Sequence, residues 1–353
     1  MKPIFSLFIG IVAWLVGAMA FAKSIPYDFT TVDIPVSGEP NRIAIPTDLN
    51  DNGQLMTNIT INDLTEALIV KRTGRKSQSA SFSCTGIPYA DTWASSINDK
   101  GQIVGYCTDV PSAPSKQYGF VRNRDGSFIL LDFPGADGTA AFGINDRGQV
   151  VGQFYGPLRN DHGGALSYRF HCFTWDNGEY KQIDFPRENT YVSCSSINKR
   201  GQVLGEYITV TLQNAYLEHG WFIYDNGSFI LDFPLSFEHV GGPAIFLADM
   251  NDEGQIIGQR SNDGADWNGL FLYDDGKFYD IELPPEFTYA DVRGMNNKGQ
   301  FVGMYSVQVG IDPFYGWPIY ESHGYVATPA HQGSRLGANN VSLRSHGPNG
   351  RRD

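Results

Sequence analysis

The 353-residue sequence predicts an all-β fold, and three observations support this class. A phrase of the form IN-D-x-GQ, followed by apolar residues, occurs six times at spacings of 45 to 53 residues. Short segments rich in aromatic and β-branched residues separate its copies, and no helical period persists. A partial repeat stands at each end of the repeated region. Together these features predict a six-bladed β-propeller closed by the N-terminal strand, which completes the last blade.

The repeated phrase predicts two strands joined by a tight turn. Asn and Asp bond to their own backbone, and Gly accepts the positive φ angle that such a turn needs. The copies are LNDNGQLM at 49, INDKGQIVG at 97, INDRGQVVG at 144, INKRGQVLG at 197, MNDEGQIIG at 250 and MNNKGQFVG at 295. Because the phrase recurs in register, we expect its Asn residues to shape the turn rather than to bind calcium.

Two further segments complete each repeat. An apolar run such as WFIYD at 221–225 predicts a third strand, and NGSFILDFP at 226–234 predicts a turn and a fourth strand. The first segment, YDFTTVDIP at 27–35, has the form of a fourth strand alone. The last segment, HGYVATP at 323–329, has the form of a third strand with no fourth after it. Pairing of these two segments would leave no strand edge open.

The N-terminal sequence has the pattern of a secretory signal peptide over residues 1–22. Lys2 supplies the positive region, residues 4–16 the apolar core, and Ala20-Phe21-Ala22 the cleavage site. The apolar stretch is short for a membrane span, so we expect no permanent membrane segment. The mature chain is predicted to be secreted or periplasmic.

Charge and composition limit the kinds of partner and define the C-terminal tail. The formal net charge of −12 repels phosphate backbones, which argues against nucleic acid as a partner. Residues 332–353 are rich in Gly, Ser, Asn and Arg and lack an apolar period, as is typical of a disordered polar tail. We therefore assign residues 23–331 to the propeller and expect a monomer.

Four cysteines in an exported chain predict two disulfides. They allow three pairings, of which we choose the pairing of near neighbours, Cys84 with Cys107 and Cys172 with Cys194. The CxxC spacing of a zinc site is absent from the sequence.

A histidine triplet opens the third strand in several repeats. It occurs as His171-Cys172-Phe173, His219-Gly220-Trp221, His323-Gly324-Tyr325 and, less closely, Tyr118-Gly119-Phe120. In this triplet and in the IN-D-x-GQ phrase, the chain resembles the extracellular HAF-repeat family over roughly residues 27–329. The resemblance implies secretion and a repeat fold, and it lends no catalytic residues. Because the three histidines share one repeat position, we expect them to make structural hydrogen bonds.

At one position of the repeat, two of the six copies carry a charged residue where the others carry a small neutral one. The residue two before each Asn of the phrase is small in four copies, namely Ser96, Gly143, Ser196 and Gly294. In the other two copies it is Asp48 and Asp249. Two carboxylates near the axial channel are a candidate cation site, with calcium as the ion. Local bonding within the turn is the alternative.

The long connections of the predicted propeller gather on the face opposite the repeated turns. Binding residues commonly lie on such loops. The candidate ligand-binding residues there are Trp93, Tyr155, Tyr191, Trp267, Tyr289, Tyr315 and Trp317. Aromatic rings interleaved with Asp, Arg and Asn suit a glycan or protein ligand, whereas the alternative is that the rings pack their own loops.

No GxSxG, HExxH or Walker phrase is present. The sequence therefore predicts a non-catalytic binding or interaction module for a glycan or a cell-surface protein. The alternative is a hydrolase or lactonase with a cation in the axial channel, an interpretation that depends on analogy at the level of the fold.

Overall fold

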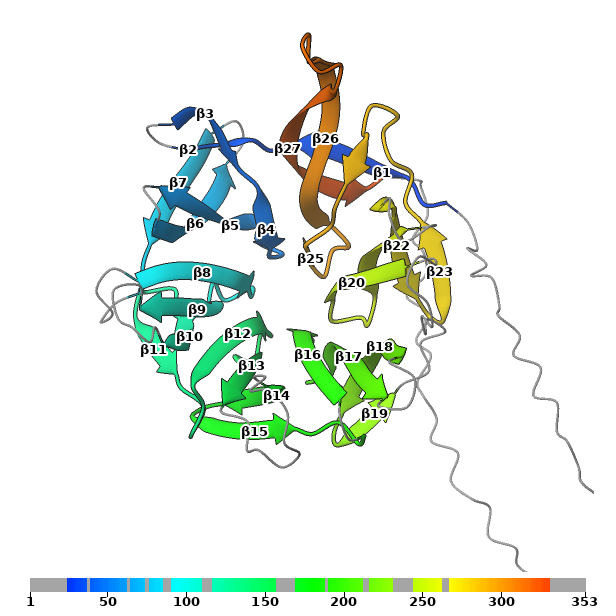
Figure 1. The fold of residues 1–353 in the computed structure, drawn as a ribbon. Helices are drawn as coiled ribbons and strands as arrows, with labels where there is room; N and C mark the ends of the chain where they lie inside the picture. Colours follow the sequence, from blue (N-terminus) through cyan, green and yellow to red (C-terminus); the bar gives the residue numbers. More distant parts are fainter. Residues whose placement is uncertain are drawn as a thin grey trace, which may run out of the picture.

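The computed structural model describes residues 24–36, 39–61, 64–73, 76–84, 90–109, 116–156, 169–187, 190–211, 216–230, 244–261 and 267–330. Within these ranges the chain is all-β, and its strands surround a central axis in a propeller-like arrangement (Figure 1). The predicted signal peptide and polar tail lie outside the described residues. No helix in the described part of the chain has the length and apolar character of a membrane span.

Each repeat supplies antiparallel strands that pair in chain order, as predicted. The first repeat forms β4 (Pro46–Leu49), β5 (Gln54–Ile61), β6 (Leu64–Thr73) and β7 (Lys76–Phe82). The second and third form β8 (Ala90–Ile97), β9 (Ile103–Asp109), β10 (Gln117–Arg122), β11 (Phe128–Leu131), β12 (Gly138–Ile144), β13 (Val150–Gly156), β14 (Arg169–Asp176) and β15 (Glu179–Ile183).

The second half of the chain continues this order. The fourth repeat forms β16 (Thr190–Ile197), β17 (Val203–Thr211), β18 (Tyr216–Asp225) and β19 (Ser228–Ile230). The fifth forms β20 (Ala244–Met250), β21 (Ile256–Ser261), β22 (Trp267–Asp274) and β23 (Lys277–Asp280). The terminal sheet contains β24 (Tyr289–Ala290), β25 (Gly294–Met295), β26 (Phe301–Ile311), β27 (Pro318–Pro329) and β1 (Tyr27–Thr31), and a separate pair joins β2 (Ile34–Val36) to β3 (Glu39–Ala44).

The turns between third and fourth strands have the conformation that their sequences predict. Asn177 and Gly178, between β14 and β15, have φ angles of 48° and 97°. Asn226 and Asp275 have φ angles of 48° and 46° at the equivalent positions of the next two repeats. Positive φ at both central residues is the requirement of the type I′ hairpin turn, whose twist matches that of the flanking strands.

The predicted six-bladed, closed β-propeller is wrong in the number of separate blades and in the closure of the ring. Four sheets hold one repeat each, whereas β8–β15 form one eight-stranded sheet. A parallel contact of Gln117 with Gly138 joins its halves, because the short connection 132–137 places the start of β12 beside β10. Apart from a single bridge between Ile25 and Ile281, no strand pairing among the described residues joins the terminal sheet to its neighbours. Strand pairing therefore does not close the ring.

Side-chain packing joins neighbouring sheets instead. Each of the six clusters of buried hydrophobic side chains found in the described residues takes members from two neighbouring repeats. In one of them, Val302 of β26 packs in the same cluster as Leu49 and Leu55 of the first repeat. The core of the molecule thus lies between the sheets, where burial of apolar surface supplies the main stabilising free energy.

The N-terminal strand pairs with the C-terminal strand, as predicted. β1 runs antiparallel to β27, from Tyr27 opposite Pro329 to Thr31 opposite Tyr325. Its Phe29 ring lies 5.4 Å from the Phe287 ring and 5.2 Å from the Tyr325 ring, measured between centroids. β1 therefore forms an outer strand of the terminal sheet.

Both predicted disulfides are confirmed. Cys84 is bonded to Cys107 and Cys172 to Cys194, with Cα–Cα separations of 6.4 and 5.8 Å. The first bridge joins the first repeat to β9 of the second, and the second joins β14 of the third repeat to β16 of the fourth. Each bridge therefore links two neighbouring repeats covalently.

We expect deletion of residues 27–35 to lower the melting temperature strongly, because it removes a strand and the Phe29 contacts. Phe29→Ala alone should cost about 2 to 3 kcal/mol, less than a fully buried Phe because the ring is partly exposed. The exposed Thr30→Ala, on the same strand, is the control and should change stability by less than about 0.5 kcal/mol. Thermal unfolding followed by circular dichroism measures all three. A deletion variant that melts together with the intact protein would contradict the role given to β1.

Removal of one disulfide should destabilise the protein without unfolding it. For a bridge that spans 22 residues, Cys172→Ala with Cys194→Ala should cost about 3 kcal/mol through the larger entropy of the unfolded chain. The double variant of Cys84 and Cys107 serves as the matched comparison. Thiol titration of the denatured wild type should detect no free thiol, and two or four thiols would refute the assignment.

Candidate functional site

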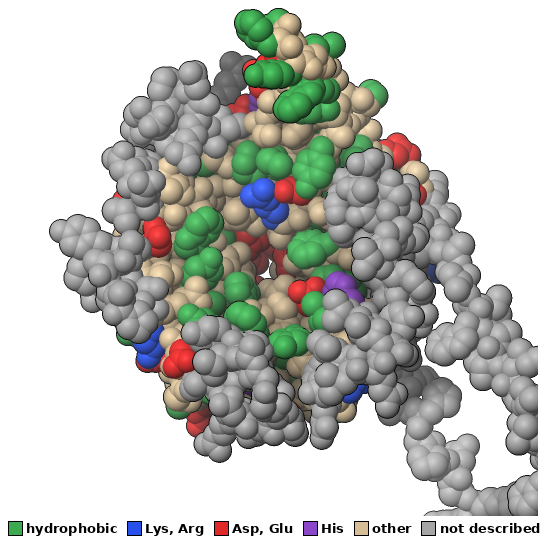
Figure 2. Space-filling view, viewed as in Figure 1, with side chains coloured by type: hydrophobic (Ala, Val, Ile, Leu, Met, Phe, Trp, Pro, Cys, Tyr) green, Lys and Arg blue, Asp and Glu red, His purple; other side chains and the backbone are tan. Residues whose placement is uncertain are grey.

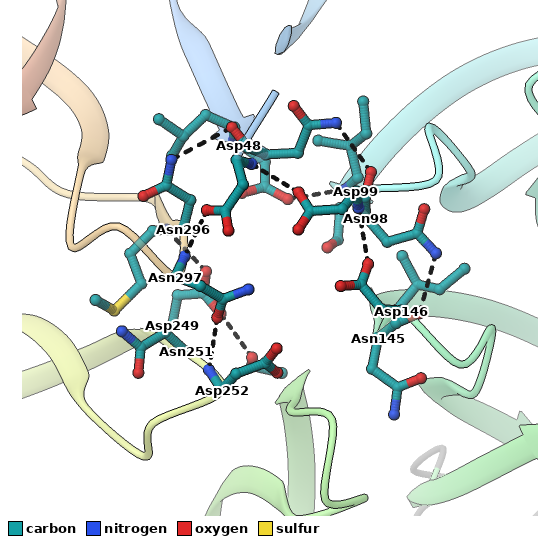
Figure 3. A pocket seen from close by; sticks show the side chains of 18 of the residues that line it. Asp48, Asn98, Asp99, Asn145, Asp146, Asp249, Asn251, Asp252, Asn296 and Asn297 are labelled. Atoms are coloured by element: carbon teal, nitrogen blue, oxygen red, sulfur yellow. Dashed lines mark hydrogen bonds between the residues drawn. The ribbon is translucent and has the colours of Figure 1, made fainter. Parts of the chain in front are cut away.

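The turns of the repeated phrase converge at one end of the axis (Figure 3). Their buried Asn residues are Asn50, Asn98, Asn145, Asn198, Asn251 and Asn296. Each Asn shapes its own turn, as predicted. In the second repeat, Asn98 Oδ1 accepts the Gln102 N–H at 2.9 Å and Asn98 Nδ2 donates to Gln102 Oε1 at 2.9 Å.

The same Nδ2 group also joins one turn to the next. Asn98 Nδ2 donates to the carbonyl oxygen of Asn145 at 3.0 Å. Equivalent bonds run from Asn50 to Asn98 (2.9 Å), from Asn145 to Asn198 (2.9 Å) and from Asn296 to Asn50 (3.3 Å). In the fourth repeat the donor instead faces a sulfur atom, since Asn198 Nδ2 lies 4.0 Å from Met250 Sδ. Asn side chains therefore link the first four turns in order and the last turn to the first.

The residue after each Asn makes a second set of links. The backbone N–H of Asp51 donates to Asp99 Oδ1 at 2.7 Å, and that of Asp99 donates to Asp146 Oδ1 at 2.8 Å. Similar bonds run from Lys199 to Asp252 (2.6 Å), from Asp252 to Asn297 (2.8 Å) and from Asn297 to Asp51 (2.9 Å). Burial raises the pKa of Asp99 to about 6, against the opposing effect of the Asp51 N–H. This end of the axis is therefore rimmed by carboxylates.

Asp48 and Asp249 lie within the ring of turns, where each carboxylate bonds to backbone N–H groups. Asp48 Oδ1 accepts the N–H of Leu49 at 2.7 Å, and Asp48 Oδ2 accepts the N–H of Ile97 in the next repeat at 2.8 Å. Asp249 is bonded on both sides. Its carboxylate accepts hydrogen bonds from Ser196 Oγ at 2.6 Å, from the N–H of Met250 at 2.7 Å and from the N–H of Met295 at 2.8 Å. Both carboxylates thus connect neighbouring repeats.

The environment of these two carboxylates favours their neutral forms. Burial, followed by the nearby Asp249 charge, raises the pKa of Asp48 well above its usual value. Burial raises the pKa of Asp249 to about 6. The N–H donors act in the opposite direction, because they stabilise the ionised carboxylate. Desolvation is the larger effect at both positions.

The space between the turns is small. The cavity measures about 60 Å³, room for on the order of four water molecules, which is too little for a sugar ring. Each carboxylate oxygen of Asp48 and Asp249 already accepts a hydrogen bond from the chain. Among the described residues, no three His, Cys, Asp or Glu side chains come together as metal ligands. The calcium site and the axial hydrolase stay predictions.

The opposite end of the axis carries exposed aromatic side chains on the first strands of the sheets. Trp93 of β8 is 39% exposed, Tyr191 of β16 is 36% exposed and Phe246 of β20 is 44% exposed. Trp93 and Phe246 each precede the Asn of their repeat by five residues, which places them about 16 Å along the strand from the turn. Figure 2 shows a hollow at the axis, with hydrophobic side chains at its edge and acidic side chains deep inside.

Neighbouring rings hold two of these aromatic side chains in place. Trp93 stacks on Tyr106 with 6.4 Å between centroids and an interplanar angle of 13°. Phe246 meets the buried Trp221 edge to face at 5.9 Å. The exposed surfaces of both rings are therefore presented in fixed orientations. Tyr289, at the start of β24, is only partly exposed, and burial raises the pKa of its hydroxyl.

Two side-chain pairs lie on the same strands or on those beside them, and the pair that contains Arg293 was not predicted. Arg293 Nη2 lies 2.9 Å from Asp291 Oδ2 before β25, and His219 Nε2 of β18 lies 3.1 Å from Glu206 Oε2 of β17. Arg293 stands three residues before its Asn, where the other repeats have Thr, Ser, Phe, Ser and Ala. A comparison of the repeats at that position would have identified it. The signal was therefore present in the sequence.

The remaining predicted ligand residues fall in other places. Tyr315 and Trp317 lie at the tip of the hairpin between β26 and β27, which extends beyond the ring in Figure 1. Tyr155 packs against Phe170 of the adjacent strand at 5.7 Å, so this ring packs within its own sheet. Only the main chain of Trp267 is described, and its side chain lies outside the description. The predicted set is therefore divided between two surfaces.

The triplet histidines make structural contacts, as expected from their shared position. His323 Nδ1 lies 3.0 Å from Asp33 Oδ2, and His219 makes its contact with Glu206. His171 stacks on Phe154 with 5.1 Å between the ring centroids. Each histidine thus contacts a neighbouring segment of the fold.

Comparisons with known proteins found similar solved structures but no related sequence. No known family model and no curated protein matches the sequence. The chain is similar to the β-propeller domain of the Trilobed protease from Pyrococcus furiosus, with 11% identity over 79% of this chain and 93% of that chain, and a TM-score of 0.41. It is also similar to the α-L-arabinanase of Penicillium chrysogenum, with 13% identity over 84% of this chain and 97% of that chain, and a TM-score of 0.44. A PL25 ulvan lyase shows 12% identity over 79% of each chain and a TM-score of 0.44. Likeness at these identities concerns the fold alone.

The raised pKa values give a prediction for stability against pH. Asp99 and Asp249 have pKa values of about 6 in the folded protein, above the value of about 3.9 in an unfolded chain. Their contribution to stability is therefore complete below about pH 4 and is lost as the pH rises through about 6. Asp249→Asn should flatten the fall in melting temperature between about pH 4 and 7, whereas Thr30→Ala, which removes no carboxyl group, should not. Equal slopes in both variants would contradict the titration of Asp249.

Proposed function

We propose that this protein is a non-catalytic binding protein that holds a glycan at the hollow opposite the Asn turns. The observation that carries the proposal is the set of exposed rings of Trp93, Tyr191 and Phe246 on the first strands. The apolar C–H faces of a sugar stack on aromatic rings, and rings held in fixed orientation lose little entropy on binding. A rigid sheet scaffold supplies that orientation here.

The Arg293–Asp291 and His219–Glu206 pairs support a polar ligand. Asp291 and Glu206 are hydrogen-bond acceptors, and Arg293 supplies several N–H donors in a planar fork. Such groups can bond to sugar hydroxyls while the rings contact the C–H faces, which is the usual division of roles in a small-molecule site. A protein ligand at the same hollow is the other outcome that the test distinguishes.

The location that fits this function is outside the cytoplasm. Two buried disulfides form and persist in oxidising compartments. The N-terminal pattern of a signal peptide supports the same assignment. The resemblance to the HAF-repeat family is part of this proposal.

A glycan array followed by calorimetry on the best ligand tests the proposal. Trp93→Ala and Phe246→Ala should each weaken binding by roughly thirtyfold, equivalent to about 2 kcal/mol, because each removes a stacking surface. Trp317→Ala, at the hairpin tip away from the hollow, is the matched control and should bind normally. Circular dichroism should show that all three variants melt near the wild type.

Two results would overturn the glycan proposal. One is an array without any specific binder, together with capture of a protein whose binding depends on Trp93. The other is a loss of affinity that follows only the loss of stability in Trp93→Ala and Phe246→Ala.

A further inference from the structure

The hairpin between β26 and β27 carries the most exposed apolar side chains among the described residues. We call residues 307–320 the aromatic prong. Its exposed members are Val309 (50%), Ile311 (63%), Phe314 (90%), Tyr315 (73%), Trp317 (69%), Ile319 (44%) and Tyr320 (53%). Exposed apolar groups that lie together in this way indicate a surface that contacts another molecule or a membrane.

No flanking strand covers the prong. β24 pairs with β26 only as far as Ser306, and β1 pairs with β27 only from Tyr325 onward. Within the described chain, both edges of residues 307–320 therefore lack a partner strand. The apolar side chains belong to both strands and to the tip, so the exposed surface is convex and extends around the prong. A fluid apolar phase covers such a shape more completely than one flat protein surface does.

The tip satisfies four of its backbone N–H groups internally. Asp312 Oδ1 accepts the N–H groups of Phe314 and Tyr315, each at 2.8 Å. Asp312 N donates to Trp317 O at 2.7 Å, and Gly316 N donates to Asp312 O at 2.9 Å. Pro313 and Pro318 have no N–H group to satisfy. Internal satisfaction of the backbone is the condition for placing a polypeptide in lipid, where water is absent.

Charge identifies the kind of lipid surface. Residues 299–334 contain no Lys or Arg, and the only acidic residues in this range are Asp312 and Glu321. Asp312 is the least exposed residue of the tip, because its carboxylate is turned to the turn's own N–H groups. The whole chain has a formal charge of −12. Attraction to anionic headgroups is therefore absent, and a zwitterionic surface is the one that fits.

We propose that the aromatic prong inserts its tip into the interface of a zwitterionic lipid bilayer and holds the protein at that surface. Trp and Tyr favour the interface because each ring has an apolar body and a polar group. The paired arms from Gln308 to Ile311 are about 10 Å long at 3.3 Å per residue. That length matches the depth of about 5 to 10 Å that interfacial elements reach. The proposal is independent of the glycan site.

Co-sedimentation with phosphatidylcholine vesicles tests the proposal on the purified exported protein. The triple variant Phe314→Ser, Tyr315→Ser and Trp317→Ser should lose at least tenfold in vesicle partition, while Trp317→Phe should stay close to the wild type. Added phosphatidylserine or low salt should not raise the partition. Vesicles with brominated acyl chains should quench wild-type fluorescence more than that of Trp317→Phe. Equal melting temperatures would show that the variants are folded.

Three outcomes would overturn the proposal. In the first, the wild type binds no vesicles, and ultracentrifugation shows a lipid-free dimer that the triple variant abolishes, so that the prong contacts protein. Equal partition of the wild type and the triple variant would place membrane contact elsewhere. Binding only to anionic vesicles would indicate an electrostatic contact. Trp93→Ala should still bind vesicles, so failure of the glycan site and failure of the prong are separable.

Discussion

The hydrogen bond from one Asn side chain to the carbonyl group of the next turn is the contact on which the rest of the structure depends. A buried amide must satisfy both donors and its acceptor, or the fold loses about 1 to 3 kcal/mol for each unpaired group. Asn98 meets this condition only when both its own Gln102 and the neighbouring Asn145 are in place. The repeats are therefore interdependent, although each is a separate strand-and-turn unit in sequence.

The buried carboxylates of Asp48 and Asp249 add further links between neighbouring repeats to those made by the Asn side chains. The Asn link from the fourth repeat is replaced by the contact with Met250 Sδ, and Asp249 lies at that point. Its carboxylate bonds to Ser196 on one side and to the N–H of Met295 on the other. Hydrogen bonds to both neighbouring repeats offset part of the cost of burying a charge there. This account favours a role in assembly, which the sequence alone could not separate from a cation site.

The parts of the structure that follow from local chemistry were predictable from sequence. Turn residues such as Asn177, the order of the strands and the pairing of β1 with β27 depend on residue types and on the period. The joining of β10 to β12 was not predictable, because it depends on how one short connection places a strand edge. Exposure was not predictable either. Trp93 and Tyr155 are both aromatic residues of the long-loop face, and each packs against a ring of its own sheet, but Trp93 is still 39% exposed.

The pairing of β1 with β27 has a consequence for the order of folding. Tyr27 is opposite Pro329, so the ladder joins segments separated by almost the entire described chain. During synthesis, the partner of β1 emerges after the middle repeats, whose local contacts have time to form before it. The terminal sheet is thus the slowest element to assemble, since its loop-closure entropy is the largest. Any chain that ends before β27 is left with β1 as an unpaired strand, which a quality-control protease can recognise.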